Sequence, residues 1–101
     1  MKRIILGPKA ADETLDETFS FLSSLATGET LSSATVTATV YSGTDASPSS
    51  IVDGSATVSG TNIVQSITGG TAGVTYDLVC EALTSSGQQL IVAGYLGVVP
   101  T

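Results

Sequence analysis

The chain has 101 residues, of which 42% are hydrophobic and 12% are charged, so it is long enough for one domain and too apolar for a disordered segment. Its net charge is −6, and its three cations, Lys2, Arg3 and Lys9, all lie near the N-terminus. No basic stripe that could neutralise phosphates is present, which argues against nucleic-acid binding. No apolar run reaches the ~18 residues of a membrane-spanning helix or, near the N-terminus, the ~7 residues of a signal-peptide core. We therefore expect a protein that is neither secreted nor membrane-bound.

The N-terminal segment is predicted to be a short arm. Residues 2–6 form an apolar run that Gly7 and Pro8 close, and this pattern indicates either an edge strand or an ordered arm. We therefore expect an N-terminal arm at residues 1–11 and a single β-sandwich domain at residues 12–101.

The next segment is acidic and then aromatic. Residues 12–18 read DETLDET, in which Asp12 could cap one turn of helix. Phe19 and Phe21 follow at a spacing of two, which is typical of a strand that places both rings on one face. This spacing favours a strand, and residues 26–30 (ATGET) then have the composition of a turn.

The clearest strand in the sequence lies at residues 31–43. Small apolar residues alternate there with Thr35, Thr37 and Thr39, and strict alternation rich in β-branched residues is typical of a half-buried strand. The threonines are predicted to face solvent as an ordinary sheet surface. The alternative is a flat polar face for ice or carbohydrate. Residues 44–50 are predicted to form a loop around Pro48.

Four further strands are expected at residues 55–60, 61–70, 74–83 and 88–99. Ile63 and Ile67 are predicted to point inward, and the third of these strands places on one face Tyr76, Leu78, Cys80 and Ala82. Residues 84–87 (TSSG) are predicted to be the hairpin turn into the last strand, where Gly94 and Gly97 indicate bulges or close backbone approach. The spacing of strands and turns predicts an all-β, immunoglobulin-like antiparallel β-sandwich of about seven strands.

The glycine-rich stretch at residues 69–73 (GGTAG) admits two interpretations, a phosphate-binding loop or a tight turn. A phosphate loop needs a lysine and a helix N-terminus after its glycines, and a dinucleotide fingerprint needs a different glycine spacing. Here no lysine follows, and the next element is a predicted strand. We therefore predict a turn with positive φ, followed by a tyrosine corner whose hydroxyl bonds to upstream backbone. The residues with a predicted structural role are Gly69, Gly70, Gly73, Tyr76 and Gly87.

Residue types that catalyse reactions are scarce. The chain has no histidine, and its single cysteine, Cys80, lies on a predicted inward face with no base beside it and no second cysteine for a disulfide. One acidic concentration could bind a divalent cation, although it lacks the glycine of an EF-hand loop: Asp12, Glu13, Asp16 and Glu17. We predict no enzymatic activity and no cofactor. A metal-dependent or hydrolytic enzyme remains an alternative that requires cation binding at this cluster.

Two segments, residues 2–6 and 89–99, are expected to contact a partner. The second holds more apolar surface than one small core can use, and such surplus surface indicates a protein partner. The first segment is basic and apolar, so a partner could order it. The predicted partner-contact residues are Lys2, Arg3, Ile4, Ile5, Leu6, Leu90, Val92, Tyr95 and Val98.

Three motifs in this order resemble a known family. The first is an acidic opening, an aromatic strand and a leucine, at Asp16, Phe19, Phe21 and Leu25. The second is the turn GETL at residues 28–31, and the third is Gly-Gly-x-x-Gly-x-x-Tyr at residues 69–76 with TSSG at residues 84–87. With these motifs the chain resembles the small immunoglobulin-like virion proteins found among the head and neck genes of tailed bacteriophages. It departs from them in having no tryptophan, since Ser20 and Phe21 stand where one is expected.

The resemblance implies a non-enzymatic structural protein of the virion, made in the host cytoplasm. Its first expected role is a capsid decoration or cement protein that binds the major capsid protein. The alternatives are a head–tail connector, neck or collar component, and a carbohydrate-binding module of a tail fibre with Tyr41 and Tyr95 as its aromatic residues. The expected partners are capsid or connector proteins, in a homo-oligomer or in many copies, and they include no nucleic acid or membrane; a glycan is the less favoured partner. Free strand edges would suit such assembly through β-augmentation.

Overall fold

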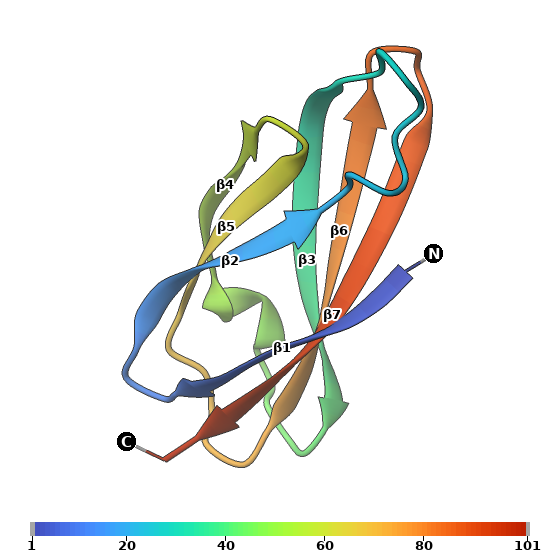
Figure 1. Ribbon diagram of the computed structural model, residues 1–101. Coiled ribbons are helices and arrows are strands. Elements are labelled where there is room, and N and C mark those ends of the chain that lie inside the picture. Colours follow the sequence, from blue (N-terminus) through green and yellow to red (C-terminus); the bar gives the residue numbers. More distant parts are fainter. Residues whose placement is uncertain (1, 101) are drawn as a thin grey trace.

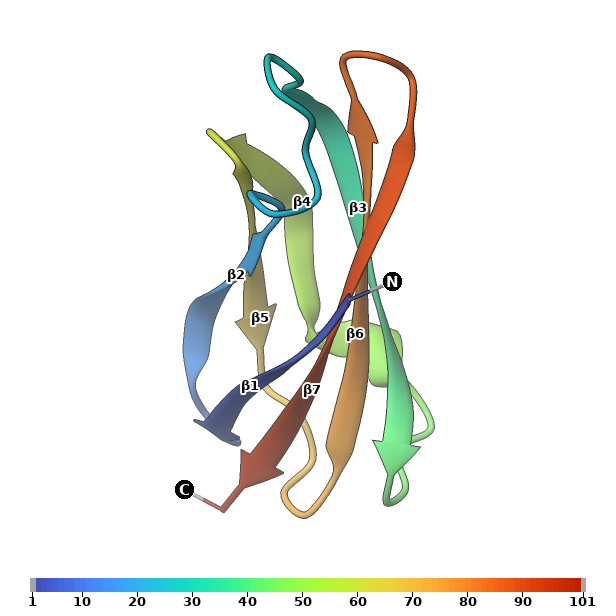
Figure 2. The same cartoon turned by 45° about the vertical axis from the view of Figure 1, so that its right-hand side comes forward.

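The chain folds into two β-sheets that pack face to face, as Figure 1 and the turned view in Figure 2 show. This computed structural model describes residues 2–100, and for Lys2 it describes the backbone alone. The strands are β1 (Lys2–Ala10), β2 (Thr14–Ser20), β3 (Leu31–Ser42), β4 (Val52–Ser59), β5 (Asn62–Thr68), β6 (Thr75–Thr84) and β7 (Gln89–Val99). Within residues 2–100 the one helical element is the 3-10 turn η1 (Pro48–Ile51).

The larger sheet has the order β1-β7-β6-β3 and the smaller sheet the order β2-β5-β4. This arrangement confirms the predicted seven-stranded sandwich, with one correction to its antiparallel character, because β1 pairs with β7 in parallel. After β1 the chain crosses to the other sheet, so no hairpin fixes the direction of β1 against its neighbour. Of the two alternatives for residues 2–6, the structure has the edge strand. Whether residues 12–101 fold without residues 1–11 stays a prediction.

The core lies between the two sheets and follows the predicted alternation. Phe19, Phe21, Ile63 and Ile67 are each 0% exposed, which confirms that both rings and both isoleucines face inward. The larger sheet contributes a row of equally buried side chains from β6, namely Tyr76, Leu78, Cys80 and Ala82. At roughly 1.5–3 kcal/mol for each large apolar side chain, this contact dominates the stability of the sandwich.

Strand β1 is held to the sandwich by two local devices. Lys9 is fully buried, and its Nζ donates to the backbone oxygens of Ala10 (2.8 Å) and Gly69 (2.5 Å), which joins β1 to the glycine-rich turn. Gly94 on β7 lets β1 approach closely, because a Cβ atom there would lie 2.6 Å from Cδ1 of Leu6. This close approach is one of the two alternatives predicted for that glycine.

Candidate functional site

The glycine-rich turn is built to hold Tyr76. Gly69, Gly70 and Gly73 have φ angles of 63°, 103° and 87°, which residues with a side chain rarely adopt. The Tyr76 hydroxyl accepts a hydrogen bond from the backbone N–H of Thr71 (2.9 Å). The N–H of Gly73 donates to the backbone oxygen of Val98 (2.9 Å). Since these two amides are used within the fold, neither is available to bind a phosphate.

The Tyr76 hydroxyl also connects the turn to a distant loop. It donates to Oδ2 of Asp45 at 2.5 Å, and Asp45 accepts a second bond from the N–H of Ser47 (2.9 Å). These bonds lower the pKa of Asp45, that of Tyr76 contributing most, because they stabilise the ionised carboxylate. Burial and the same bond to Asp45 raise the pKa of Tyr76. The loop at residues 44–50 is therefore fastened to the base of β6.

The acidic residues near β2 do not converge on one point. Glu13 accepts a hydrogen bond from the N–H of Ala10 at 3.0 Å. Asp16 is exposed, whereas Glu17 is half-buried on the opposite face of the strand. The Oε2 atom of Glu17 is buried without a hydrogen-bond partner, and burial raises the pKa of this carboxyl. Within residues 2–100, no group of three or more residues of the types that bind metals is close enough to hold a metal ion.

Cys80 is buried in the core, and burial, with a smaller effect of the Glu81 charge, raises its thiol pKa to about 12. The thiol therefore stays protonated at neutral pH and is a poor nucleophile.

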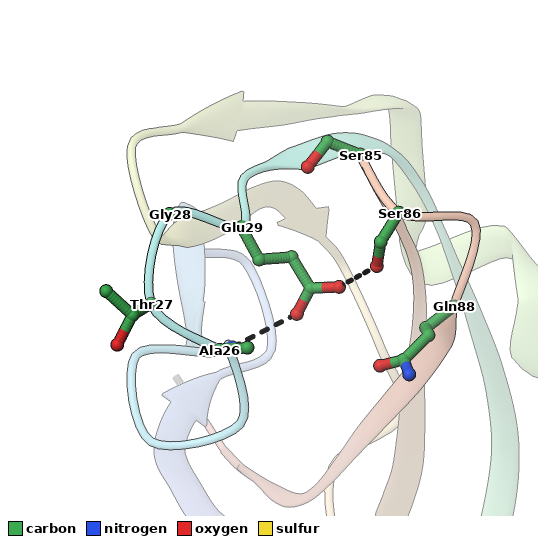
Figure 3. A pocket seen from close by; sticks show the side chains of 7 residues that line it. All are labelled: Ala26, Thr27, Gly28, Glu29, Ser85, Ser86 and Gln88. Carbon is green, nitrogen blue, oxygen red and sulfur yellow. Dashed lines mark hydrogen bonds between the residues drawn. The ribbon is translucent and has the colours of Figure 1, made fainter.

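A shallow pocket of about 340 Å³ lies between two loops (Figure 3). Its lining comprises Ala26, Thr27, Gly28, Glu29, Ser85, Ser86 and Gln88. Glu29 accepts hydrogen bonds from the Ser86 hydroxyl and, at 3.1 Å, from the N–H of Ala26. These bonds, first that of Ser86, lower the pKa of Glu29. The Glu29 carboxylate is therefore occupied in fastening one loop to the other.

The outer face of the larger sheet carries a different kind of surface. The strand registers place Ile5 opposite Tyr95, Tyr95 opposite Asp77, and Asp77 opposite Thr39, so one row of side chains crosses all four strands. Ile5 is 80% exposed. We name the surface formed by Arg3, Ile5, Tyr41, Asp77 and Tyr95 the aromatic face.

Arg3 and the two tyrosines hold the aromatic face together. Nη1 of Arg3 lies 3.0 Å from Oδ1 of Asp77, and the guanidinium carbon lies 5.1 Å from the ring centroid of Tyr95. The Tyr95 ring packs against Tyr41, with centroids 4.5 Å apart and planes tilted by 47°. A guanidinium over an aromatic ring and a tilted ring pair are both attractive arrangements. The face is thus pre-ordered, while 63% of Tyr41 remains exposed.

The predicted partner-contact residues divide into three groups. Arg3, Ile5 and Tyr95 meet on the aromatic face. Ile4, Leu6 and Leu90 are half-buried against the core. Val92 and Val98 are 0% and 3% exposed and belong to the core itself, so the surplus of apolar residues in β7 is smaller than the sequence indicates. The predicted contact by the Lys2 side chain lies outside the described part of the chain.

Tyr41 and Asp77 join the aromatic face although they were not among the predicted partner contacts. The sequence does predict that both side chains face outward, because each follows the alternation of its strand. The sequence does not predict the strand order β1-β7-β6-β3. Tyr41 and Asp77 become neighbours of Tyr95 and Arg3 only through that order.

The model of one protein family, described as podophage GP4 fiber-tail adaptor protein gp77, matches residues 9–93. The match contains β2 to β6 entirely and ends within β7, so Arg3, Ile5 and Tyr95 lie beyond it. No curated protein matches the chain. Residues 2–100 include no helix with the length and apolar character needed to cross a membrane.

Proposed function

The chain belongs to the gp77 family of podophage fiber-tail adaptor proteins, and from this we propose that it joins two protein components of a phage tail by binding one of them through the aromatic face. It is a structural protein of the virion. The proposed role is binding alone, without catalysis.

The exposure of the aromatic face carries this proposal. Ile5 and Tyr41 are large side chains that are 80% and 63% exposed, and both neighbour Tyr95, over whose ring Arg3 is already held in position. Exposed aromatic and arginine side chains are enriched among the residues that supply most of the binding energy in protein interfaces. Because Arg3 is oriented by Asp77 and Tyr95 before binding, a partner orders few side chains when it docks.

The family description also bears on the position of the protein in the particle. Capsid decoration was the first role expected from the sequence, and a tail fibre module was among the alternatives. Since the family is described as a fibre–tail adaptor, we favour the tail over the capsid. The partners are then other tail or fibre proteins.

Complementation of a phage that lacks this gene tests the proposal. The phage is grown in cells that produce either the natural chain or its Ile5→Asp variant, which places a charge at the β1 end of the aromatic face, opposite Tyr95. We expect the variant particles to lack fibres in electron micrographs and to lose host adsorption. A buried charge without a partner in an interface costs about 2 kcal/mol or more, which corresponds to roughly a thirtyfold loss of affinity.

Leu22→Asp is the matched control, because Leu22 is 68% exposed and lies beyond β2, outside the aromatic face. It receives the same charge and is expected to assemble normally. Equal assembly of both variants, or equal failure of both, would contradict docking through the aromatic face. Antibody labelling of the capsid instead of the tail would refute the position in the particle.

A second candidate function is glycan binding by a tail fibre module. It is favoured by the contact between Tyr41 and Tyr95, since this class of site requires clustered exposed aromatic residues. Binding on a glycan array that Tyr41→Ala abolishes would support it, and an array without a signal would remove it.

A further inference from the structure

The four strands at the ends of the two sheets differ in how well they are protected against pairing with another chain. Natural proteins protect such edges with charged residues, prolines and irregular pairing. β1 carries Arg3, Pro8 and a register shift between Leu6 and Lys9. β2 carries Asp16 and Glu17, and β4 carries an irregular stretch after Asp53.

Strand β3 has none of these protections along its centre. Its twelve residues, LSSATVTATVYS, include no charged residue and no proline, and its pairing with β6 is regular from Ser33 to Val40. It ends the larger sheet on the side opposite β1 (Figure 1). Among residues 2–100 its one hydrogen-bonded neighbour is β6, and although β4 and η1 pack close to β3, no strand pairs with the backbone groups on its other side.

The sequence of β3 is complementary to itself when it is read in the opposite direction. In an antiparallel pair of two β3 strands centred on Thr37, each Val36 faces an Ala38 and each Ala34 faces a Val40 on the inner side. On the outer side Thr35 faces Thr39. Every large side chain thus meets a small one, and threonine pairs across strands are favourable.

We propose that the protein forms a two-fold symmetric dimer in which the β3 strands of two copies pair antiparallel around Thr37. The two larger sheets then become one eight-stranded sheet. The occupant of this edge is a second copy because the pairing matches large with small residues throughout the regular segment. Shifting the centre by one residue, to Val36, instead places Val36 against Val36 and Ala34 against Ala38.

Electrostatics favour this edge over the others. Each copy has a net charge of −6, so two copies repel each other in general. β3 is the edge strand without a charge of either sign, whereas β2 and β4 carry carboxylates and β1 carries cations, and like charges directly opposite are destabilising. The inference rests on strand geometry and stands independently of the proposed function.

Charge reversal at the symmetry axis is the first test. Thr37 is exposed, and the proposed axis brings its two copies face to face. By sedimentation equilibrium, the natural chain should have about twice the mass of the 10.1-kDa monomer, whereas Thr37→Lys and Thr37→Asp should each have the monomer mass. An equimolar mixture of the two variants should regain the dimer mass, because a lysine then faces an aspartate. Thr18→Lys, the same change on the exposed face of β2, should remain dimeric.

Cross-linking is the second test, and it determines the register of the two β3 strands. Circular dichroism first verifies that each cysteine variant is folded. Thr37→Cys should form a disulfide-linked dimer on oxidation, since directly opposed Cβ atoms lie about 4.5–5.5 Å apart. Thr39→Cys should not, because the two copies of residue 39 are then offset by about 13 Å along the strands, beyond the reach of a disulfide. The buried Cys80 does not interfere.

Several results would overturn the proposal. In sedimentation, these are a monomer mass for the natural chain at all concentrations, a dimer mass for Thr37→Lys or Thr37→Asp alone, or a monomer mass for their mixture. In cross-linking, it is a disulfide that forms as readily at residue 39 as at residue 37.

Discussion

Replacing Tyr76 with phenylalanine removes a single oxygen atom from the core and leaves the packing of the ring unchanged. Tyr76 is 0% exposed, and its hydroxyl makes two hydrogen bonds, from the N–H of Thr71 and to the carboxylate of Asp45. The substitution therefore tests whether the glycine-rich turn and the loop at residues 44–50 stabilise the fold through this one atom.

The expected loss follows from those two bonds. A hydrogen bond of a buried hydroxyl contributes about 1 kcal/mol to folding, so Tyr76→Phe should lower the free energy of unfolding by about 2 kcal/mol. In a domain of this size, that loss lowers the melting temperature by roughly 10 °C. The lowered pKa of Asp45 adds a pH dependence. Its stabilisation is present at neutral pH and is lost as the pH falls through the folded-state pKa, so the gap between the two proteins should narrow in acid.

Urea unfolding followed by circular dichroism, at pH 7 and at pH 3, measures both quantities. Tyr95→Phe is the matched control, because Tyr95 loses a hydroxyl on the outer face, and it should change stability by less than about 0.5 kcal/mol. A loss below about 0.5 kcal/mol for Tyr76→Phe at pH 7 would refute a stabilising role for the tyrosine corner.

Three further experiments test other parts of the structure. Glu17→Gln should raise the free energy of unfolding at pH 7 by less than about 1 kcal/mol, because burial raises the pKa of Glu17 and disfavours its ionised form, while solvent screens this half-buried carboxyl. The gain should disappear below pH 4, where the carboxyl is protonated in both states, and an equal gain at pH 3 would contradict this reasoning. The Cys80 thiol, with a pKa of about 12, should resist iodoacetamide at pH 8 in the native protein and react fully in urea, as mass spectrometry would show; rapid native labelling would be inconsistent with its burial. Gly94→Ala should push Leu6 outward and destabilise the fold by about 1 kcal/mol. It should also speed amide hydrogen exchange in β1 more than in β2, and an equal increase of the exchange rate in both strands would argue against this contact.

Much of the fold is encoded in local patterns. The alternation in β3 and β6 predicted both strands and their buried faces, because a residue in a strand has only two sides on which to lie. The glycine-rich turn was predictable for a similar reason, since three glycines close together before a tyrosine satisfy a specific backbone requirement.

The aromatic face could not be assembled from the sequence. Arg3 and Asp77 are 74 positions apart, and their contact depends on β1 joining the edge of β7 in parallel. Alternation assigns each residue a side but no neighbour across the sheet. For the same reason Val92 and Val98 were predicted as partner contacts, because the sequence does not reveal that β7 is an interior strand with little apolar surface to spare.

The parallel pairing of β1 with β7 has a mechanical consequence. Both strands run in the same direction, from the pair Lys2–Val92 to the pair Ala10–Val99 (Figure 1). A pull applied between Lys2 and Val99 therefore draws the two strands past each other and loads all the hydrogen bonds between them at once. In an antiparallel hairpin pulled at its open end, the bonds would instead break one after another. The first and last strands thus form a shear clamp, and the core behind it is shielded until that clamp gives way.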